Sequence, residues 1–204
     1  MHENGWLFYK TRIPADVRIP ADIQIPADGS VHTLPAGCTS EVWCPGVMRI
    51  KANGISAFPF FVWWIFHMLH VFSNRDYGLV IVRRGSRVIH RSVITPRYFR
   101  FPFMAVDDIQ VGDTWTDPSE RGKGIATTAL ERVLRAPSSH KRMCWYVVEP
   151  DNQASIRVVE KAGFLLAGRG IRTRPFGLGI LGRYMLTEPT SLAEAGQAPQ
   201  SGCN

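Results

Sequence analysis

The chain has 204 residues, of which 45% are hydrophobic, a length and composition that suit one domain with its own core. Its formal net charge of +7 favours anionic partners, such as a phosphorylated cofactor or a membrane surface. The basic residues are spread along the chain rather than grouped in blocks, which argues against a nucleic-acid-binding protein.

The four cysteines, Cys38, Cys44, Cys144 and Cys203, form no C-x-x-C pair, and no histidine spacing completes a zinc site. We therefore expect no metal and a reducing, cytoplasmic setting, with a Cys38–Cys44 disulfide left open as an alternative. The N-terminal sequence MHENGWLFYK lacks the apolar core of a signal peptide, which agrees with that setting.

Residues 1–50 differ in composition from the rest and are predicted to form a separate N-terminal arm. They contain an Ile-Pro-Ala-Asp repeat of period six, at residues 13–16, 19–22 and 25–28. Three prolines at this spacing exclude a helix and a central strand, because proline lacks the backbone N–H that both need. The repeat predicts an extended arm, in a polyproline-II or edge-strand conformation, packed on the body of the protein.

The most apolar stretch, FPFFVWWIFHMLHVF at residues 58–72, predicts a helix with Pro59 at its start. It is shorter than the roughly 20 residues that a membrane span needs. His67 and His70 are expected on or near one face of this helix. Two interpretations are open: a buried core helix, or an apolar wall that contacts a substrate, a membrane or a lipid-linked molecule.

Strands are predicted over residues 77–83, 88–95 and 108–116, followed by a helix over 127–135. The third strand leads into the helix through DPSERGKGIA, at residues 117–126. A glycine-containing turn between a strand and a helix N-terminus presents backbone N–H groups to a phosphate. The glycines lack a Cβ, so an anion can approach the main chain closely. The turn matches neither the nucleoside-triphosphate loop nor the dinucleotide loop spacing.

The rest of the chain predicts a buried strand over 142–149 and a helix over 153–162, with Asn152 as the N-cap. Gly163 ends this helix. Short strands are expected over 164–167 and 180–187, joined by a glycine-rich connection. Residues 189–204 are small and polar, which predicts a disordered tail.

Two motifs together resemble the GCN5-related N-acetyltransferase (GNAT) superfamily. They are RGKGIA at residues 121–126 and, after an intervening strand, EPDNQAS at 149–155 with EKAGF at 160–164. The second is closest to the N-x-x-S-x-R-V-x-E-K-x-G-F variant of ribosomal-protein alanine acetyltransferase-like members. The resemblance implies an α/β fold over residues 51–188, a twisted mixed sheet with helices on both faces, and acetyl-CoA as the acetyl donor.

In this family acetyl-CoA lies where two parallel strands splay apart, here 108–116 and 142–149. The loop would bind the diphosphate through its backbone, and the third strand would pair with the pantetheine arm. Asn152 matches a position that contacts the CoA arm. The implied cofactor-binding residues are Thr114, Trp115, Thr116, Arg121, Gly122, Lys123, Gly124, Ile125, Ala126 and Asn152.

Acetyl transfer to an amine needs a base or water that takes the amine proton and N–H donors for the oxyanion. Many relatives carry glutamate at the position of Gln110, which cannot act as a base. Asp108 lies two residues earlier on the same strand face and is the predicted base. Asp113 is expected on the opposite face unless a bulge intervenes.

The departing thiolate benefits from an acid, and many relatives have a tyrosine where this chain has Val159. Ser155 is the predicted acid, with Tyr146 and Tyr184 as further candidates. No covalent intermediate is needed, so Cys144 is expected to be a core residue.

The predicted function is transfer of an acetyl group from acetyl-CoA to a primary amine by direct attack in a ternary complex. The alternative is a non-catalytic acyl-CoA-binding module, which Gln110 and Val159 favour. The apolar segment 58–72 suggests an acceptor with an apolar portion and leaves peripheral membrane contact and a homodimer open.

Overall fold

The protein is described by a computed structural model that covers residues 5–13, 33–49, 52–55, 58–135, 142–175 and 182–190. The Ile-Pro-Ala-Asp repeat from Pro14 onward, Cys203 and the tail beyond residue 190 lie outside the described residues. The predicted arm conformation and the predicted disorder of the tail therefore remain predictions.

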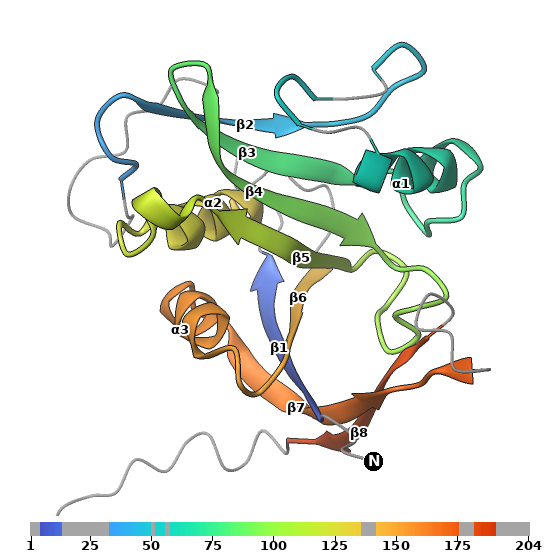
Figure 1. The fold of residues 1–204 in the computed structure, drawn as a ribbon. Helices are drawn as coiled ribbons and strands as arrows, with labels where there is room; N and C mark the ends of the chain where they lie inside the picture. The colour runs from blue at the N-terminus through green and yellow to red at the C-terminus, as the bar shows by residue number, and fades with distance from the viewer. Residues whose placement is uncertain are drawn as a thin grey trace, which may run out of the picture.

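The described residues form one mixed eight-stranded sheet with three α-helices (Figure 1). The strand order is β2-β3-β4-β5-β6-β1-β7-β8, and only β5 and β6 are parallel neighbours. The strands are β1 (Trp6–Ile13), β2 (Cys38–Trp43), β3 (Gly78–Arg84), β4 (Arg87–Pro96), β5 (Ile109–Thr116), β6 (Arg142–Val148), β7 (Leu165–Arg172) and β8 (Tyr184–Pro189). The helices are α1 (Phe58–Met68), α2 (Ile125–Leu134) and α3 (Gln153–Lys161), with a 3₁₀ turn, η1, at Pro118–Glu120.

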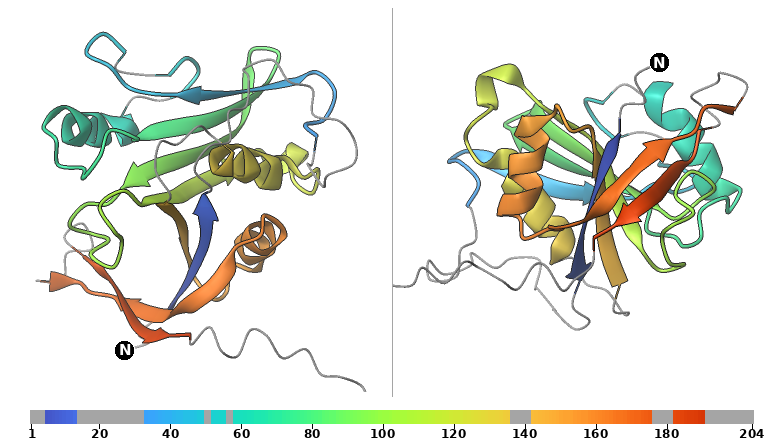
Figure 2. Two further views of the ribbon diagram at one scale, coloured as in Figure 1. Left: turned by 180° about the vertical axis from the view of Figure 1, so that it is seen from behind. Right: turned by 90° about the horizontal axis from the view of Figure 1, so that it is seen from below.

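Helices cover both faces of the sheet, as expected. Val80 and Val82 of β3 pack with α2 and α3 in one core cluster, whereas Leu79 and Ile81 pack in a second cluster with Phe60 of α1. The alternation follows from the pleat, which sends successive side chains to opposite faces. Figure 2 shows α2 and α3 on one side of the sheet and α1 on the other.

The sheet extends into the N-terminal part of the chain, across the predicted division at residue 50. Strand β1 lies between β6 and β7 and pairs with both, and β2 pairs with β3 along its whole length. Phe8 and Ile13 of β1 are fully buried in the core. Residues 6–13 are therefore a central part of the sheet rather than a separate arm.

Strand β7 (Leu165–Arg172) is longer than the strand predicted over 164–167. The predicted strand ended before Gly168 and Gly170. Gly168 and Gly170 lie inside β7, paired with β8. A Cβ on Gly170 would lie 2.0 Å from the carbonyl oxygen of Met185. These glycines therefore permit close strand pairing instead of ending the strand.

Helix α1 ends at Met68, before the predicted end at residue 72. His70 follows it in a left-handed conformation, with φ of 57°, and pairs with Arg75. The two histidines therefore do not share a helix face: His67 is buried and His70 is exposed. In the part of the chain that the structure describes, no helix is long and apolar enough to cross a membrane.

Candidate functional site

The parallel strands β5 and β6 stay paired over only three residues each. Their register joins Ile109 to Cys144, Gln110 to Trp145 and Val111 to Tyr146. Beyond Val111, β5 continues to Thr116 beside β4 alone. The two strands thus diverge at their carboxyl ends, the side on which open α/β sheets bind ligands.

A cleft of about 460 Å³ lies where these strands diverge, between α2 and α3. This volume is within the usual range for ligand pockets. The cleft is lined by Thr114, Trp115, Thr116, Glu120, Arg121, Gly122, Gly124, Ile125, Ala126, Thr127, Tyr146, Asn152, Ala154, Ser155, Arg157, Val158 and Lys161.

The glycine turn presents its main chain to this cleft. Gly122 and Gly124 have φ angles of 77° and 76°, and a Cβ on either would meet no atom within 4 Å. Helix α2 starts at Ile125, directly after Gly124, and has no side-chain cap. Its first N–H groups therefore lack an intrahelical or capping acceptor, which makes this helix end suited to an anion.

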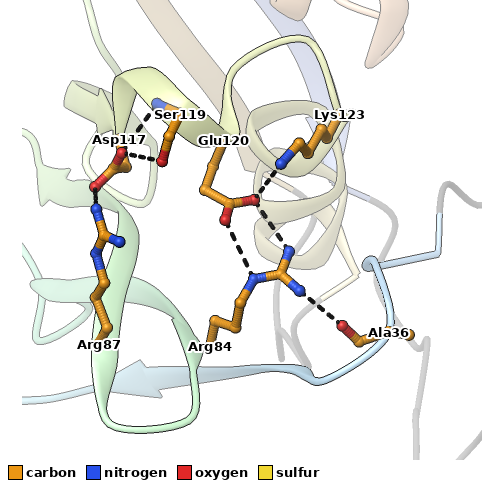
Figure 3. Close-up of polar contacts among 7 residues, drawn as sticks. All are labelled: Ala36, Arg84, Arg87, Asp117, Ser119, Glu120 and Lys123. Atoms are coloured by element: carbon orange, nitrogen blue, oxygen red, sulfur yellow. Dashed lines mark hydrogen bonds and ion pairs between the residues drawn. The ribbon is translucent and has the colours of Figure 1, made fainter.

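Figure 3 shows how a carboxylate beside the cleft is neutralised. Glu120 accepts hydrogen bonds from Arg84 Nε and Nη2, at 3.2 and 3.0 Å, and from Lys123 Nζ at 3.0 Å. These contacts, Arg84 first, lower the pKa of the Glu120 carboxyl. Arg84 also donates to the carbonyl of Ala36 at 3.0 Å. Glu120 therefore opposes an anion in the cleft less than an unpaired carboxylate would.

The start of the turn is held by a second carboxylate. Asp117 accepts from the backbone N and the hydroxyl of Ser119, at 3.0 and 2.7 Å, and pairs with Arg87 (Figure 3). The Ser119 bonds, followed by Arg87, lower the pKa of the Asp117 carboxyl. The β3–β4 hairpin thus supplies two arginines that stabilise the turn: Arg84 binds Glu120, and Arg87 binds Asp117.

Two further cations line the cleft from α3. Arg157 and Lys161 are four residues apart, which places them on one helix face. Neither has an ion pair in the described part of the chain. With Arg121, they give the cleft a positive lining. The R-x-x-x-K spacing was present in the sequence, but only the position of α3 shows that it faces the cleft.

Nine of the ten predicted cofactor-binding residues line the cleft, the exception being Lys123. Lys123 Nζ is turned to Glu120. Asn152 caps α3, and its Oδ1 accepts from the backbone N of Ser155 at 3.1 Å. Ser155 and Tyr146 also line the cleft, whereas Tyr184 packs on Phe101 and does not. Cys144 and Val159 are fully buried in the core.

Asp108 occupies a different environment from that expected of a base. It precedes β5 and does not line the cleft. Its carboxylate accepts from the backbone N of Ala105 and Met143 and from Trp145 Nε1, each at 2.9 Å. Asp108 is 4% exposed. The structure thus gives it the role of joining the start of β5 to β6, where the strands are still paired.

Replacing Asp108 with asparagine is expected to lower the free energy of unfolding by about 2 to 3 kcal/mol, because an amide NH₂ would face N–H donors. Chemical denaturation measures this loss. The kcat of the folded variant should stay within about tenfold of the wild type. A loss of kcat above 100-fold at normal stability would instead make Asp108 the base.

A chain of buried polar side chains supports β5 from β4. His90 is fully buried, and its ring nitrogens contact Thr116 Oγ1 at 2.8 Å and Ser92 Oγ at 3.1 Å. Ser92 Oγ lies 3.0 Å from Thr114 Oγ1. Burial lowers the pKa of His90 to about 4, so the ring is neutral at pH 7. The two threonines that line the cleft are thereby held in position by one neutral imidazole.

Comparison with known protein families identifies the family to which the chain is similar. The model of the acetyltransferase (GNAT) family matches residues 48–164, which is more than half of the chain. This match confirms the predicted superfamily and fold class. No significant match was found among curated proteins. The described residues contain no group of three or more potential metal ligands.

Several solved structures are similar to this one at low identity. A GNAT-family acetyltransferase from Novosphingobium aromaticivorans has 16% identity and a TM-score of 0.46, with 81% of this chain and 61% of that chain covered. One from Colwellia psychrerythraea has 15% identity and a TM-score of 0.46, covering 81% and 53%. The ribosomal-protein-S18-alanine N-acetyltransferase from Escherichia coli has 13% identity and a TM-score of 0.40, covering 62% and 78%. The chain thus spans less than two thirds of the first two relatives.

Proposed function

Because the chain belongs to the acetyltransferase (GNAT) family, we propose that it transfers an acetyl group from acetyl-CoA to a primary amine. The observation that carries this proposal is the cationic cleft at the divergence of β5 and β6, which contains the glycine turn. The acceptor amine attacks the thioester directly: an N–C bond forms, the C–S bond breaks, and the thiolate leaves with a proton.

The cleft residues fit the parts of acetyl-CoA. The open space above Gly122 and Gly124 and the free N–H groups of α2 suit the diphosphate. Arg121, Arg157 and Lys161 add positive charge around it. The edge of β5 from Thr114 to Thr116, released from β6, leaves backbone groups for the amides of the pantetheine arm.

Two side chains are placed to assist the thiolate. Ser155 and Tyr146 both line the cleft and carry a hydroxyl that can donate a proton or a hydrogen bond. A covalent acetyl-cysteine is not part of the proposal, because Cys144 is fully buried and burial raises the pKa of its thiol. The attack in a ternary complex needs only the two bound substrates.

A non-catalytic acyl-CoA-binding module is the second candidate. It is favoured by three residues at the expected acid and base positions. Gln110 donates to the carbonyl of Val111 at 2.7 Å, Val159 is in the core, and Asp108 is occupied by three donors. In this reading the cleft would still bind acetyl-CoA.

Thiol release from acetyl-CoA, measured with an amine panel beside calorimetric titration of CoA, separates the two functions. An enzyme is expected to bind CoA and to release thiol in an amine-dependent way, and Ser155→Ala with Tyr146→Phe should reduce kcat by about 10- to 1,000-fold. CoA binding without release across the panel would support the binding module. Absence of CoA binding would contradict both functions.

A further inference from the structure

The face of the sheet opposite the cleft carries a second polar cluster at the same level of β5. It lies on the α1 side, whereas α2 and α3 lie on the side of the cleft (Figure 2). Acetyl-CoA bound between α2 and α3 would fill that side. The β5–β6 pairing ends after Val111 and Tyr146, and an acceptor bound on the α1 side would approach the thioester between the two strands beyond that point.

A β-bulge in β5 shapes this face. Arg91 is opposite Trp115 and Val93 is opposite Gly112, so β5 contains one residue more than β4 between these two pairs. Asp113 lies in the bulge with φ of 45°, in the left-handed region that few non-glycine residues adopt. Because of the bulge, the direction of the Asp113 side chain no longer follows the regular alternation of the strand, from which the sequence had predicted its face.

Arg91 is held between two aromatic rings on this side. Its guanidinium carbon lies 5.3 Å from the ring centroid of Phe60 in α1 and 6.0 Å from that of Trp115. Such stacking positions a planar cation without using its hydrogens. The Nε atom of Arg91 is buried and has no hydrogen-bond partner. A buried donor of this kind is expected to meet an acceptor that is absent from the chain itself.

Asp113 supplies the opposite charge. Asp113 is exposed to solvent, but partial desolvation of its carboxyl raises the pKa, and the nearby Arg91 partly offsets this rise. Arg91 and Asp113 therefore interact through their charges, yet no ion pair joins them within the described residues. Two opposite charges that are close but not paired with each other suit a ligand that carries both complementary charges.

Two more buried polar atoms without partners belong to this cluster. The Tyr77 hydroxyl is completely buried, and this burial, followed by the charge of Asp113, raises the pKa of the phenol. His67 is 7% exposed, its Nδ1 atom is unpaired, and its ring lies 6.1 Å from that of Tyr77. A buried polar atom that stays without a partner destabilises the fold, so the three atoms together (Arg91 Nε, the Tyr77 hydroxyl and His67 Nδ1) indicate a ligand site.

We propose that this cluster binds the acceptor and that the acceptor is a free amino acid. Its ammonium group would lie at Asp113 and its carboxylate at Arg91. The inference rests on the proposed function and names its substrate class. During the reaction Asp113 takes one proton from the ammonium group, and the amine nitrogen bonds to the acetyl carbon as the C–S bond breaks. The second proton that the nitrogen loses is transferred to the departing thiolate. A peptide N-terminus lacks the adjacent carboxylate and would fit Arg91 less well.

Acceptor triplets test the inference: an L-amino acid, its carboxamide and its decarboxylated amine, each assayed for kcat/KM by thiol release. The wild type is expected to prefer the amino acid by about tenfold or more, since only its carboxylate can form a charge-assisted hydrogen bond with Arg91. Arg91→Gln should remove this preference by raising the KM for the amino acid, with little change for the amine. Arg91→Lys should restore part of it.

Arg169→Gln is the matched control, because Arg169 is an exposed strand arginine outside both sites. Thermal unfolding of each variant separates a folding defect from a specificity change. Equal use of all three acceptors by the wild type, or an unchanged preference in Arg91→Gln, would overturn the inference while the acetyltransferase function stands. Turnover of peptides alone would do the same. Absence of turnover with every acceptor would overturn both.

Discussion

Replacing Gly124 with valine is expected to weaken acetyl-CoA binding by about 30-fold or more. Gly124 has φ of 76°, and its missing Cβ leaves open space on the cleft side. A branched side chain there would keep the diphosphate away from the N–H groups that begin α2. The loss of one or two charge-assisted hydrogen bonds, at about 1.5 to 3 kcal/mol each, accounts for an effect of this size. Calorimetric titration of acetyl-CoA measures it.

Gly37→Val is the matched control for this prediction. Gly37 has φ of 73°, its Cβ would also meet no atom within 4 Å, and it does not line the cleft. Both variants should therefore lose a similar stability, about 1 to 2 kcal/mol, from the left-handed backbone. Only Gly124→Val should lose acetyl-CoA affinity. Near-normal affinity in that variant would show that the turn is not the diphosphate site.

Acidification is expected to destabilise the protein through His90. The pKa of its imidazole is about 4 in the folded protein, lowered by burial from 6.5. As pH falls below 6.5, His90 becomes protonated in the unfolded chain but stays neutral in the folded protein. The free energy of unfolding therefore decreases. The difference of about 2.5 between the two pKa values corresponds to about 3 kcal/mol, lost between pH 6.5 and pH 4.

Urea denaturation at several pH values tests the His90 prediction against His90→Gln. Glutamine can keep a hydrogen bond to Ser92 or Thr116 but does not titrate. Burial also lowers the pKa of His67, so the two proteins should share part of the pH dependence. The wild type should show the steeper decline between pH 6.5 and 4. Parallel declines in both proteins would remove His90 as the source.

The local features of the fold and of the cleft follow from the sequence. The strand, glycine turn and helix start around Gly124 are encoded within about 20 consecutive residues, and the structure reproduces them. The cap from Asn152 to Ser155 is equally local. Such features depend on backbone conformation and neighbouring side chains, for which residue type and spacing are sufficient.

The parts that could not be predicted depend on contacts between distant segments. Asp108 meets Met143 and Trp145, which are 35 and 37 residues away, and these contacts change its role. Glu120 is neutralised by Arg84 from another hairpin. The position of β1 likewise depends on its pairing with β6 and β7, which lie more than 120 residues away in the sequence. The position of Asp113 depends on a bulge that the sequence left open as an alternative, although the glycine before it, Gly112, is typical of bulges.

The structure of the protein with bound CoA tests the central claim most directly. Diphosphate oxygens are expected at hydrogen-bonding distance, roughly 2.7 to 3.2 Å, from backbone nitrogens of residues 122–126. The pantetheine arm is expected along Thr114–Thr116, with the sulfur where β5 and β6 diverge. A diphosphate bound elsewhere, with the glycine turn empty, would contradict it.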